Sequence, residues 1–172
     1  MLTQTLVMVW GALEVFISDI VRSMLNTNPS LAVLLMTSDS SKRYFRREVA
    51  IEDLMTRGFD LNRSMGDVLF SDKWLDNLPR IKEVISTLLP RADDLHRALA
   101  AKELWLLWQR RHLIVHRRGV IDAQFVANTE ASDAVGSRLI VSSKDVDEAL
   151  NEGGRGSRRV IGRTLTRLYP SG

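Results

Sequence analysis

Apolar residues recur three and four positions apart through most of this 172-residue sequence, and this period constrains the fold more than any other feature. Such spacing brings apolar side chains onto one face of an α-helix, whereas a half-buried strand would alternate them with polar residues. The clearest example is a predicted helix over 3–25, with an apolar face formed by Leu13, Phe16, Ile17, Ile20, Val21 and Met24. The period therefore predicts an all-α fold.

Turn residues, prolines and glycines divide the following sequence into further predicted helices. An apolar piece over 31–36 leads into a loop of small polar residues. Pro79 either kinks a helix or marks a new start, and Gly119 ends the longest helix. In chain order we expect a charged helix over 42–57 with Tyr44, Phe45, Val49 and Leu54 towards the core, a short helix within 59–73, a helical stretch over 74–89 and a long helix over 93–117.

The residues after Gly119 are less regular and include the one segment with strand character. Residues 120–127 fit either a short helix or an extended piece, and Arg138–Val141 is the plausible strand. Ser142 or Ser143 can cap a helix that starts at Lys144. The sequence thus predicts a helical fold with at most one short extended segment.

Length and composition predict a single domain over 1–172, because a chain of this size with 45% hydrophobic residues can bury a core without disulfides. The sequence has no cysteine, which excludes disulfides, thiolate metal sites and a thiol nucleophile, and fits a reducing compartment. Residues 151–172 form a possible basic extension, with five arginines against one glutamate. A last core helix fits this segment best, while a basic arm on RNA or a frayed tail stays open.

The apolar run Leu6–Leu13 has the composition of a targeting segment but lacks its charge pattern. No cationic residue precedes the run, and Glu14 and Asp19 follow it. A signal peptide begins with a positive region, and a membrane span needs about 20 apolar residues. We therefore expect a buried core helix in a cytoplasmic protein that does not engage a membrane.

Residues suited to chemistry are concentrated at 110–118, directly behind an apolar run that contains Trp105 and Trp108. This window holds four arginines and two of the three histidines in the chain. Histidine is the side chain best suited to proton transfer near neutral pH. Arginine keeps its proton and grips phosphate at two points; it makes up 19 of the 24 cationic residues, although a GC-rich genome would give the same excess. The two tryptophans fit a core or a dimer interface better than a base-stacking platform.

The helical period places these groups relative to one another. His112 and His116 are four residues apart, so their imidazoles lie on one face, one turn from each other. Arg111 lies about 140° round the helix from His116. Both border one cleft only if the arginine reaches round the helix or a second helix closes the site. A two-fold dimer supplies such a helix, because an isologous contact brings the same segment of a second copy opposite the first.

Residues 111–116, Arg-His-Leu-Ile-Val-His, resemble the signature of the HEPN superfamily of RNases and RNA-binding domains. That signature is an arginine with a polar neighbour, followed several residues later by a histidine. The continuation over 117–122 resembles members from bacterial defence and toxin systems. The likeness is specific over 110–122 and extends in outline to Ala12–Phe16, to Asn28 and Pro29, and to Val135 and Gly136.

This resemblance implies a HEPN-like helical bundle, a face-to-face homodimer and a composite site made from two copies of the motif. Arg111 matches the motif arginine, His116 the motif histidine and His112 the polar neighbour. That neighbour is commonly asparagine in the family, and a histidine here either adds a second acid–base group or orients Arg111. The RNA-binding basic rim would consist of Arg110, Arg117 and Arg118.

The resemblance further implies a metal-independent endoribonuclease without a cofactor, acting as a toxin or in antiviral defence. In that reaction the ribose 2′-OH attacks the adjacent phosphate, with proton transfer assigned to His116 and charge stabilisation to Arg111. The expected partners are RNA, a second copy of the chain and an antitoxin protein such as a nucleotidyltransferase.

Other interpretations stay open at this stage. A HEPN domain that binds RNA or a nucleotide without cleavage, one that acts by binding a partner protein, and a plain structural domain all fit the sequence. His116 also suits a helix C-terminus through the dipole alone. His112 and His116 have zinc-ligand spacing, but Leu113 stands where a metalloprotease motif needs glutamate, and His96 would lie about 24 Å away along a straight helix. We therefore expect no metal site.

Overall fold

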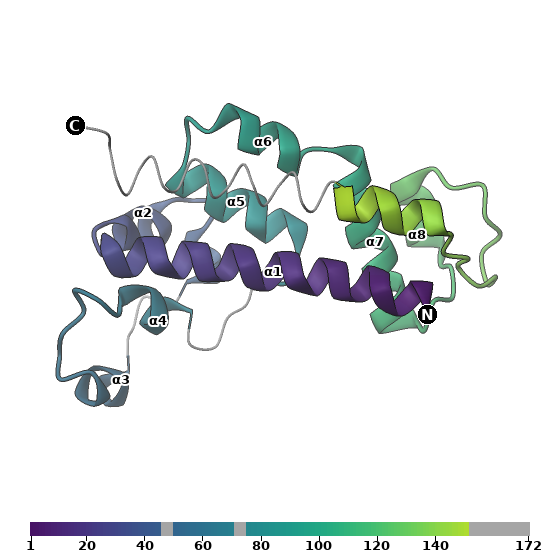
Figure 1. Ribbon diagram of the computed structural model, residues 1–172. Coiled ribbons are helices and arrows are strands. Elements are labelled where there is room, and N and C mark those ends of the chain that lie inside the picture. Colours follow the sequence, from purple (N-terminus) through teal and green to yellow (C-terminus); the bar gives the residue numbers. More distant parts are fainter. Residues whose placement is uncertain (46–49, 71–74, 152–172) are drawn as a thin grey trace. The chain divides into compact units, whose positions relative to one another are not determined.

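The computed structural model describes residues 1–45, 50–70 and 75–151, and its regular secondary structure there is helical (Figure 1). Residues 143–151 also form a helix. The predicted all-α class is therefore confirmed for the described part of the chain. In chain order the other helices are α1 (Leu2–Thr27), α2 (Leu31–Thr37), the 3-10 helix η1 (Lys42–Tyr44), α3 (Ile51–Thr56), α4 (Met65–Leu69), α5 (Leu78–Leu88), α6 (Asp93–Leu99), α7 (Lys102–Arg117) and α8 (Ala123–Thr129).

The extended segment predicted over 138–141 is reduced to an isolated antiparallel bridge between Val120 and Arg138. The described ranges contain no strand. Two backbone hydrogen bonds flank the bridge: the N–H of Ile121 donates to Ser137 (2.9 Å), and the N–H of Leu139 donates to Gly119 (2.8 Å). The bridge therefore joins the segment after α7 to the segment after α8.

The chain divides into two compact units. The first unit comprises Met1–Leu13 and the described residues from Arg97 onwards, and the second comprises the described residues of Glu14–His96. The expectation of a single domain over 1–172 stays a prediction. The possible basic extension over 151–172 lies, beyond its first residue, outside the described residues.

Helix α1 follows the predicted apolar period and is long and apolar enough to span a membrane, a property that core helices of soluble proteins and N-terminal signal sequences share. Its inward residues are buried at the spacing that the sequence indicated. Residues on the other side of the helix, Met8 and Val15 among them, are exposed. The buried set is Leu6, Trp10, Leu13, Ile17, Val21, Met24 and Leu25.

The core of the second unit is built around α2, which packs against α5, α4 and η1. Asn77 begins α5, because its side-chain oxygen accepts a hydrogen bond from the backbone N–H of Arg80 (2.9 Å). Pro79 occupies the first turn of α5, where its missing N–H costs nothing. Of the two possibilities left open for Pro79, the new start is therefore correct. The short helix expected within 59–73 is also present, as α4.

A hydrogen-bonded junction holds α4 against α1 in the second unit. The side-chain oxygen of Asn26 accepts from the backbone N–H of Gly66 (2.7 Å), and its amide nitrogen donates to Asp67 (3.0 Å). The two helices approach so closely that a Cβ atom added at Gly66 would lie 2.2 Å from the carbonyl oxygen of Arg22. Only glycine fits this contact, because the obstructing atom belongs to the backbone.

The continuous charged helix predicted over 42–57 is wrong. The described part of this segment contains η1 and then α3, and both Phe45 and Ala50 have extended backbone angles. Phe45 is buried and packs edge-on against Phe70, with ring centroids 5.3 Å apart. We attribute the early end of the helix to this tertiary contact, which outweighs the helix propensity of the charged sequence. Val49, expected in the core, lies outside the described residues.

The single long helix predicted over 93–117 is also wrong, because an extended residue, Ala101, separates α6 from α7. Alanine is the best helix former, so the break has no local sequence signal. Leu99 and Leu104 are both buried, yet a continuous helix would point them about 140° apart. The break allows both to be buried. The distance expected between His96 and His112 along one straight helix therefore does not apply.

The junction at Gly66 predicts opposite effects for two glycine-to-alanine changes. Gly66→Ala should lower the free energy of unfolding by about 2–3 kcal/mol, because the new methyl group meets backbone that cannot move aside cheaply. Gly11→Ala adds a methyl group with nothing within 4 Å. In the middle of α1 it should raise stability by about 0.5–1 kcal/mol. Urea unfolding followed by circular dichroism measures both, and equal effects of the two changes would contradict the close approach.

Candidate functional site

The residues singled out by the sequence lie on α7, in the first unit. As predicted, α7 ends at Arg117: Arg118 and Gly119 both adopt left-handed backbone angles, with φ of 55° and 74°. The N–H groups of these two residues both donate to the carbonyl oxygen of Leu113. This C-terminal cap supplies hydrogen-bond donors to a carbonyl group in the last turns of α7. The chain then reverses its direction directly after the histidines.

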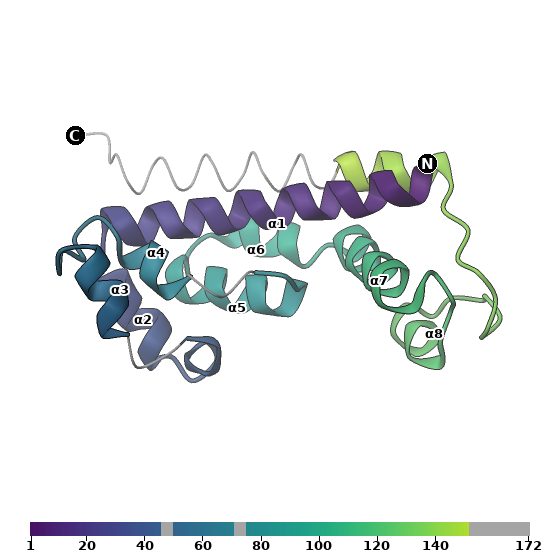
Figure 2. The ribbon, with the colours of Figure 1, turned by 90° about the horizontal axis from the view of Figure 1, so that it is seen from below.

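The segment after this reversal packs on one side of α7. Leu113 forms a buried cluster with Ile121 and Phe125, and Figure 2 shows α7 and α8 side by side. Asp122 begins α8 by accepting a hydrogen bond from the N–H of Phe125 (2.8 Å). Residues 120–127 therefore combine both predicted possibilities, a bridge residue followed by a helix. With this side of α7 covered, His112 and His116 remain exposed.

The exposed side of α7 carries a row of four rings. Trp105 and Trp108 have ring centroids 4.9 Å apart, Trp108 and His112 6.3 Å, and His112 and His116 4.6 Å. The shared face predicted for the two histidines is thus confirmed. Both tryptophans are half-buried within the single copy, and the indole N–H of Trp105 donates to the carbonyl of Asn128 at 3.4 Å.

The surroundings of His112 oppose its protonation. Desolvation by neighbouring groups lowers the pKa of His112 below its ordinary value, and the positive charges of His116, Arg111 and Arg117 lower this pKa further. The carboxylate of Asp122 acts in the opposite direction but does not outweigh them. His112 is therefore mainly neutral near pH 7, and a neutral imidazole can accept a proton.

The arginines near the histidines occupy different environments. Arg110 forms an ion pair with Asp145 at 2.9 Å, and only 23% of its side chain is exposed. Arg117 and Arg118 are exposed, and Arg117 lies 3.5 Å from Asp122. Arg111 is half-buried. Of the three cations assigned to an RNA-binding rim, Arg117 and Arg118 thus lie at the surface, whereas the charge of Arg110 is already matched within the first unit.

Asp145 belongs to the helix over 143–151, and its contacts explain how this helix is fixed to α7. Ser142 and Asp145 exchange hydrogen bonds in a capping box, so the cap expected at Ser142 or Ser143 is formed by Ser142. Burial would raise the pKa of Asp145, but the hydrogen bonds from Ser142 and the charge of Arg110 hold this pKa below its ordinary value. Asp145 is therefore ionised and well paired.

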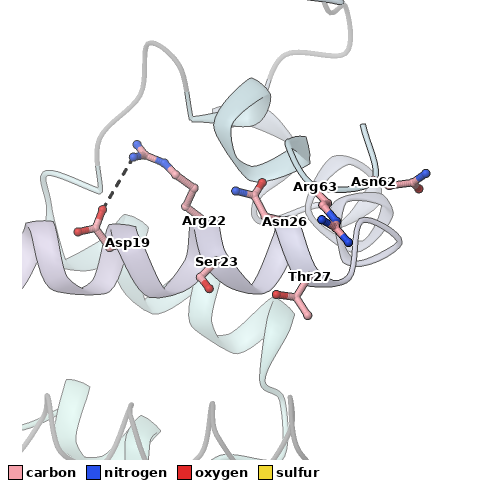
Figure 3. Close-up of a pocket in the computed structure, with 7 residues that line it drawn as sticks. All are labelled: Asp19, Arg22, Ser23, Asn26, Thr27, Asn62 and Arg63. Carbon is pink, nitrogen blue, oxygen red and sulfur yellow. Dashed lines mark ion pairs between the residues drawn. The ribbon is translucent and has the colours of Figure 1, made fainter. Parts of the chain in front are cut away.

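The second unit contains a polar recess that no sequence pattern indicated, with a volume of about 510 Å³ (Figure 3). Its inner groups have structural partners: Asn26 holds α4, and Arg22 lies 3.8 Å from Asp19 and 3.6 Å from Asp67. Among the described residues, no histidine borders the recess and no pair of groups suited to acid–base chemistry lines it. Its lining consists of Asp19, Arg22, Ser23, Asn26, Thr27, Asn62 and Arg63.

Comparison of the chain with protein-family models, with curated proteins and with solved structures finds no match. In the described ranges, no group of three or more histidine, aspartate, glutamate or cysteine side chains is arranged to hold a metal ion. Proton transfer at the histidine pair, with arginines beside it, is the chemistry that the described residues of α7 can supply.

The electrostatic surroundings of His112 can be tested by nuclear magnetic resonance, because the chain has only three histidines. The pH midpoint of His112 should lie below the ordinary histidine value of about 6.5. His116→Ala should move this midpoint upwards, because removing a neighbouring cation makes protonation of His112 easier. His96→Ala is the control, since His96 belongs to the other unit. A midpoint at or above the ordinary value, or one unmoved by His116→Ala, would contradict the described environment.

Proposed function

We propose that this chain is a metal-independent endoribonuclease of the HEPN type, with a HEPN-like fold and a composite site in a homodimer. The observation that carries this proposal is the pair of exposed imidazoles, with ring centroids 4.6 Å apart, next to Arg111 and Arg117. Proton-transfer groups beside phosphate-binding groups are what cleavage of a phosphodiester by acid–base catalysis requires.

In the proposed reaction the ribose 2′-OH loses its proton to a base and attacks the adjacent phosphorus. The bond from phosphorus to the 5′-oxygen breaks, and an acid protonates that oxygen, which leaves a 2′,3′-cyclic phosphate and a 5′-hydroxyl. His116 takes part in proton transfer, and Arg111 stabilises the charge that develops on the phosphate oxygens. DNA lacks the 2′-OH and is spared. The reaction uses no metal or organic cofactor.

A second copy completes the site in this proposal. Arg111 lies about 140° round α7 from His116, so one helix alone does not direct both side chains into one cleft. Val115, next to His116, is an apolar residue with 47% exposure, which suits a surface that a second copy covers. We further propose a cytoplasmic toxin or antiviral defence protein, neutralised by an antitoxin such as a nucleotidyltransferase.

Cleavage assays with a defined RNA test the proposed reaction. The protein should cut this RNA in excess chelator and should not cut the same strand with a 2′-deoxy substitution at the cut site. His116→Ala should lose activity by a factor of about 10² to 10⁴ while keeping its fold. Arg111→Lys should also cleave this RNA slowly, because an ammonium group cannot bind phosphate at two points as a guanidinium does.

Two matched changes separate catalysis from binding. Arg118→Ala should weaken RNA binding and reduce its salt dependence, because an exposed cation contributes through phosphate charge. His96→Ala should have no effect on cleavage. Cleavage of the 2′-deoxy strand, or parental activity of His116→Ala, would refute the mechanism. Tight RNA binding without cleavage would favour the alternative, a non-catalytic HEPN domain that binds RNA or a nucleotide.

The homodimer has its own test in light scattering at micromolar concentration. The parent should have the mass of a dimer, and Val115→Glu should shift the equilibrium towards the monomer by placing a charge in the apolar contact. Val135→Glu is the matched control, because Val135 is 60% exposed and lies in a turn and not on α7. A clean monomer for the parent would argue strongly against a composite site.

A further inference from the structure

The three histidines of the chain differ in what their ring nitrogens contact. His96 has its Nε2 atom 2.9 Å from the carbonyl oxygen of Leu89, so this ring is engaged in the fold. His112 and His116 have ring contacts and charged neighbours, but in the part of the chain that the structure describes neither makes a hydrogen bond. Both are also exposed. Two adjacent imidazoles are thus free to exchange protons with a ligand.

The position of His112 does not suit the alternative role of orienting Arg111. Residues adjacent in a helix point about 100° apart and do not face each other. The ring neighbours of His112 are instead Trp108, one turn before it, and His116, one turn after it. His112 is therefore placed to act together with His116.

The surroundings of the pair disfavour the protonated form of His112. Desolvation disfavours a proton on His112, and the charges of His116, Arg111 and Arg117 on α7 act in the same direction. Asp122, on the segment before α8, favours the proton but does not outweigh them. Two imidazoles this close also resist holding two protons together, since like charges repel. When one of two adjacent titratable groups is neutral and the other carries the proton, an active site has a base and an acid at the same pH.

We propose that His112 is the catalytic base of the RNA cleavage reaction and His116 the acid, both provided by the same copy of α7. This assignment rests on the proposed function and gives the second imidazole a role of its own. His112 takes the proton of the 2′-OH as the new bond from oxygen to phosphorus forms. His116, protonated, gives its proton to the departing 5′-oxygen. Solvent then returns both imidazoles to their starting states, so no other reactant is needed.

A substrate with a 5′-bridging sulfur tests the two roles separately, because a thiolate leaves without being protonated. On ordinary RNA, His112→Asn and His116→Asn should each lose a factor of about 10² to 10⁴ in cleavage rate. On the sulfur-bridged RNA, His116→Asn should recover most of this loss and His112→Asn should recover little. Recovery by His112→Asn instead would overturn the assignment of base and acid.

The pH dependence of kcat/KM provides a readout that a merely structural role of His112 would not change. The rate of the parent should fall at acidic pH as His112 becomes protonated, and this acidic limb should disappear in His112→Asn. Binding of a non-cleavable 2′-deoxy strand should stay within a few-fold of the parent. His96→Asn is the matched control and should keep both the rate and the acidic limb. A His112→Asn enzyme with near-parental rate and an unchanged acidic limb would overturn this inference while leaving the proposed endoribonuclease intact.

Mixed dimers test whether base and acid belong to one copy. When His112→Asn and His116→Asn proteins are mixed, neither copy contains a complete pair, so activity should not exceed that of the separate variants. Restored activity would mean that base and acid come from different copies, and would overturn this part of the assignment. Mixing the parent with the double variant verifies subunit exchange, because the mixed dimers should keep one active pair. If the parent cleaves no RNA, the proposed function fails and the assignment fails with it.

Discussion

The packing of Leu113 against Ile121 and Phe125 determines which side of α7 meets solvent, and the candidate site depends on it. This contact requires the chain to reverse directly after α7, which the left-handed residues Arg118 and Gly119 allow. Once this side of α7 is buried, His112 lies about 100° away round the helix and stays exposed together with His116. The same apolar contact that stabilises the first unit thereby presents both imidazoles at its surface.

Two acidic residues from neighbouring segments pair with arginines near opposite ends of the basic stretch 110–118. Asp145 binds Arg110 and ties α7 to the helix over 143–151, while Asp122 lies beside Arg117 and also begins α8. Asp145 matches the charge of the half-buried Arg110. Asp122 only partly offsets the positive surroundings of His112. The cations that remain near His112 therefore add to desolvation in lowering its pKa.

Features governed by residues close in sequence were predictable. The course of α1, the end of α7 before Gly119 and the shared face of His112 and His116 follow from helical period and cap residues. The break at Ala101 and the extended backbone at Phe45 were missed because burial of Leu99, Leu104 and Phe45, rather than local propensity, accounts for them. The pairing of Arg110 with Asp145 was out of reach for a similar reason, since nothing in either local sequence links the two.

Substrate charge gives the histidine pair a further property in the proposed reaction. In the free protein desolvation and the positive neighbours of His112 lower its pKa, so this imidazole is mainly neutral and ready to accept a proton. A bound phosphodiester brings a negative charge beside the same imidazole and favours its protonated form, so the pKa of His112 rises on binding. The base thus becomes stronger when RNA is in place, and the arginines that hold the phosphate are partly neutralised by it. An asparagine at position 112 could hydrogen-bond the substrate, but it could not couple substrate binding to proton transfer in this way.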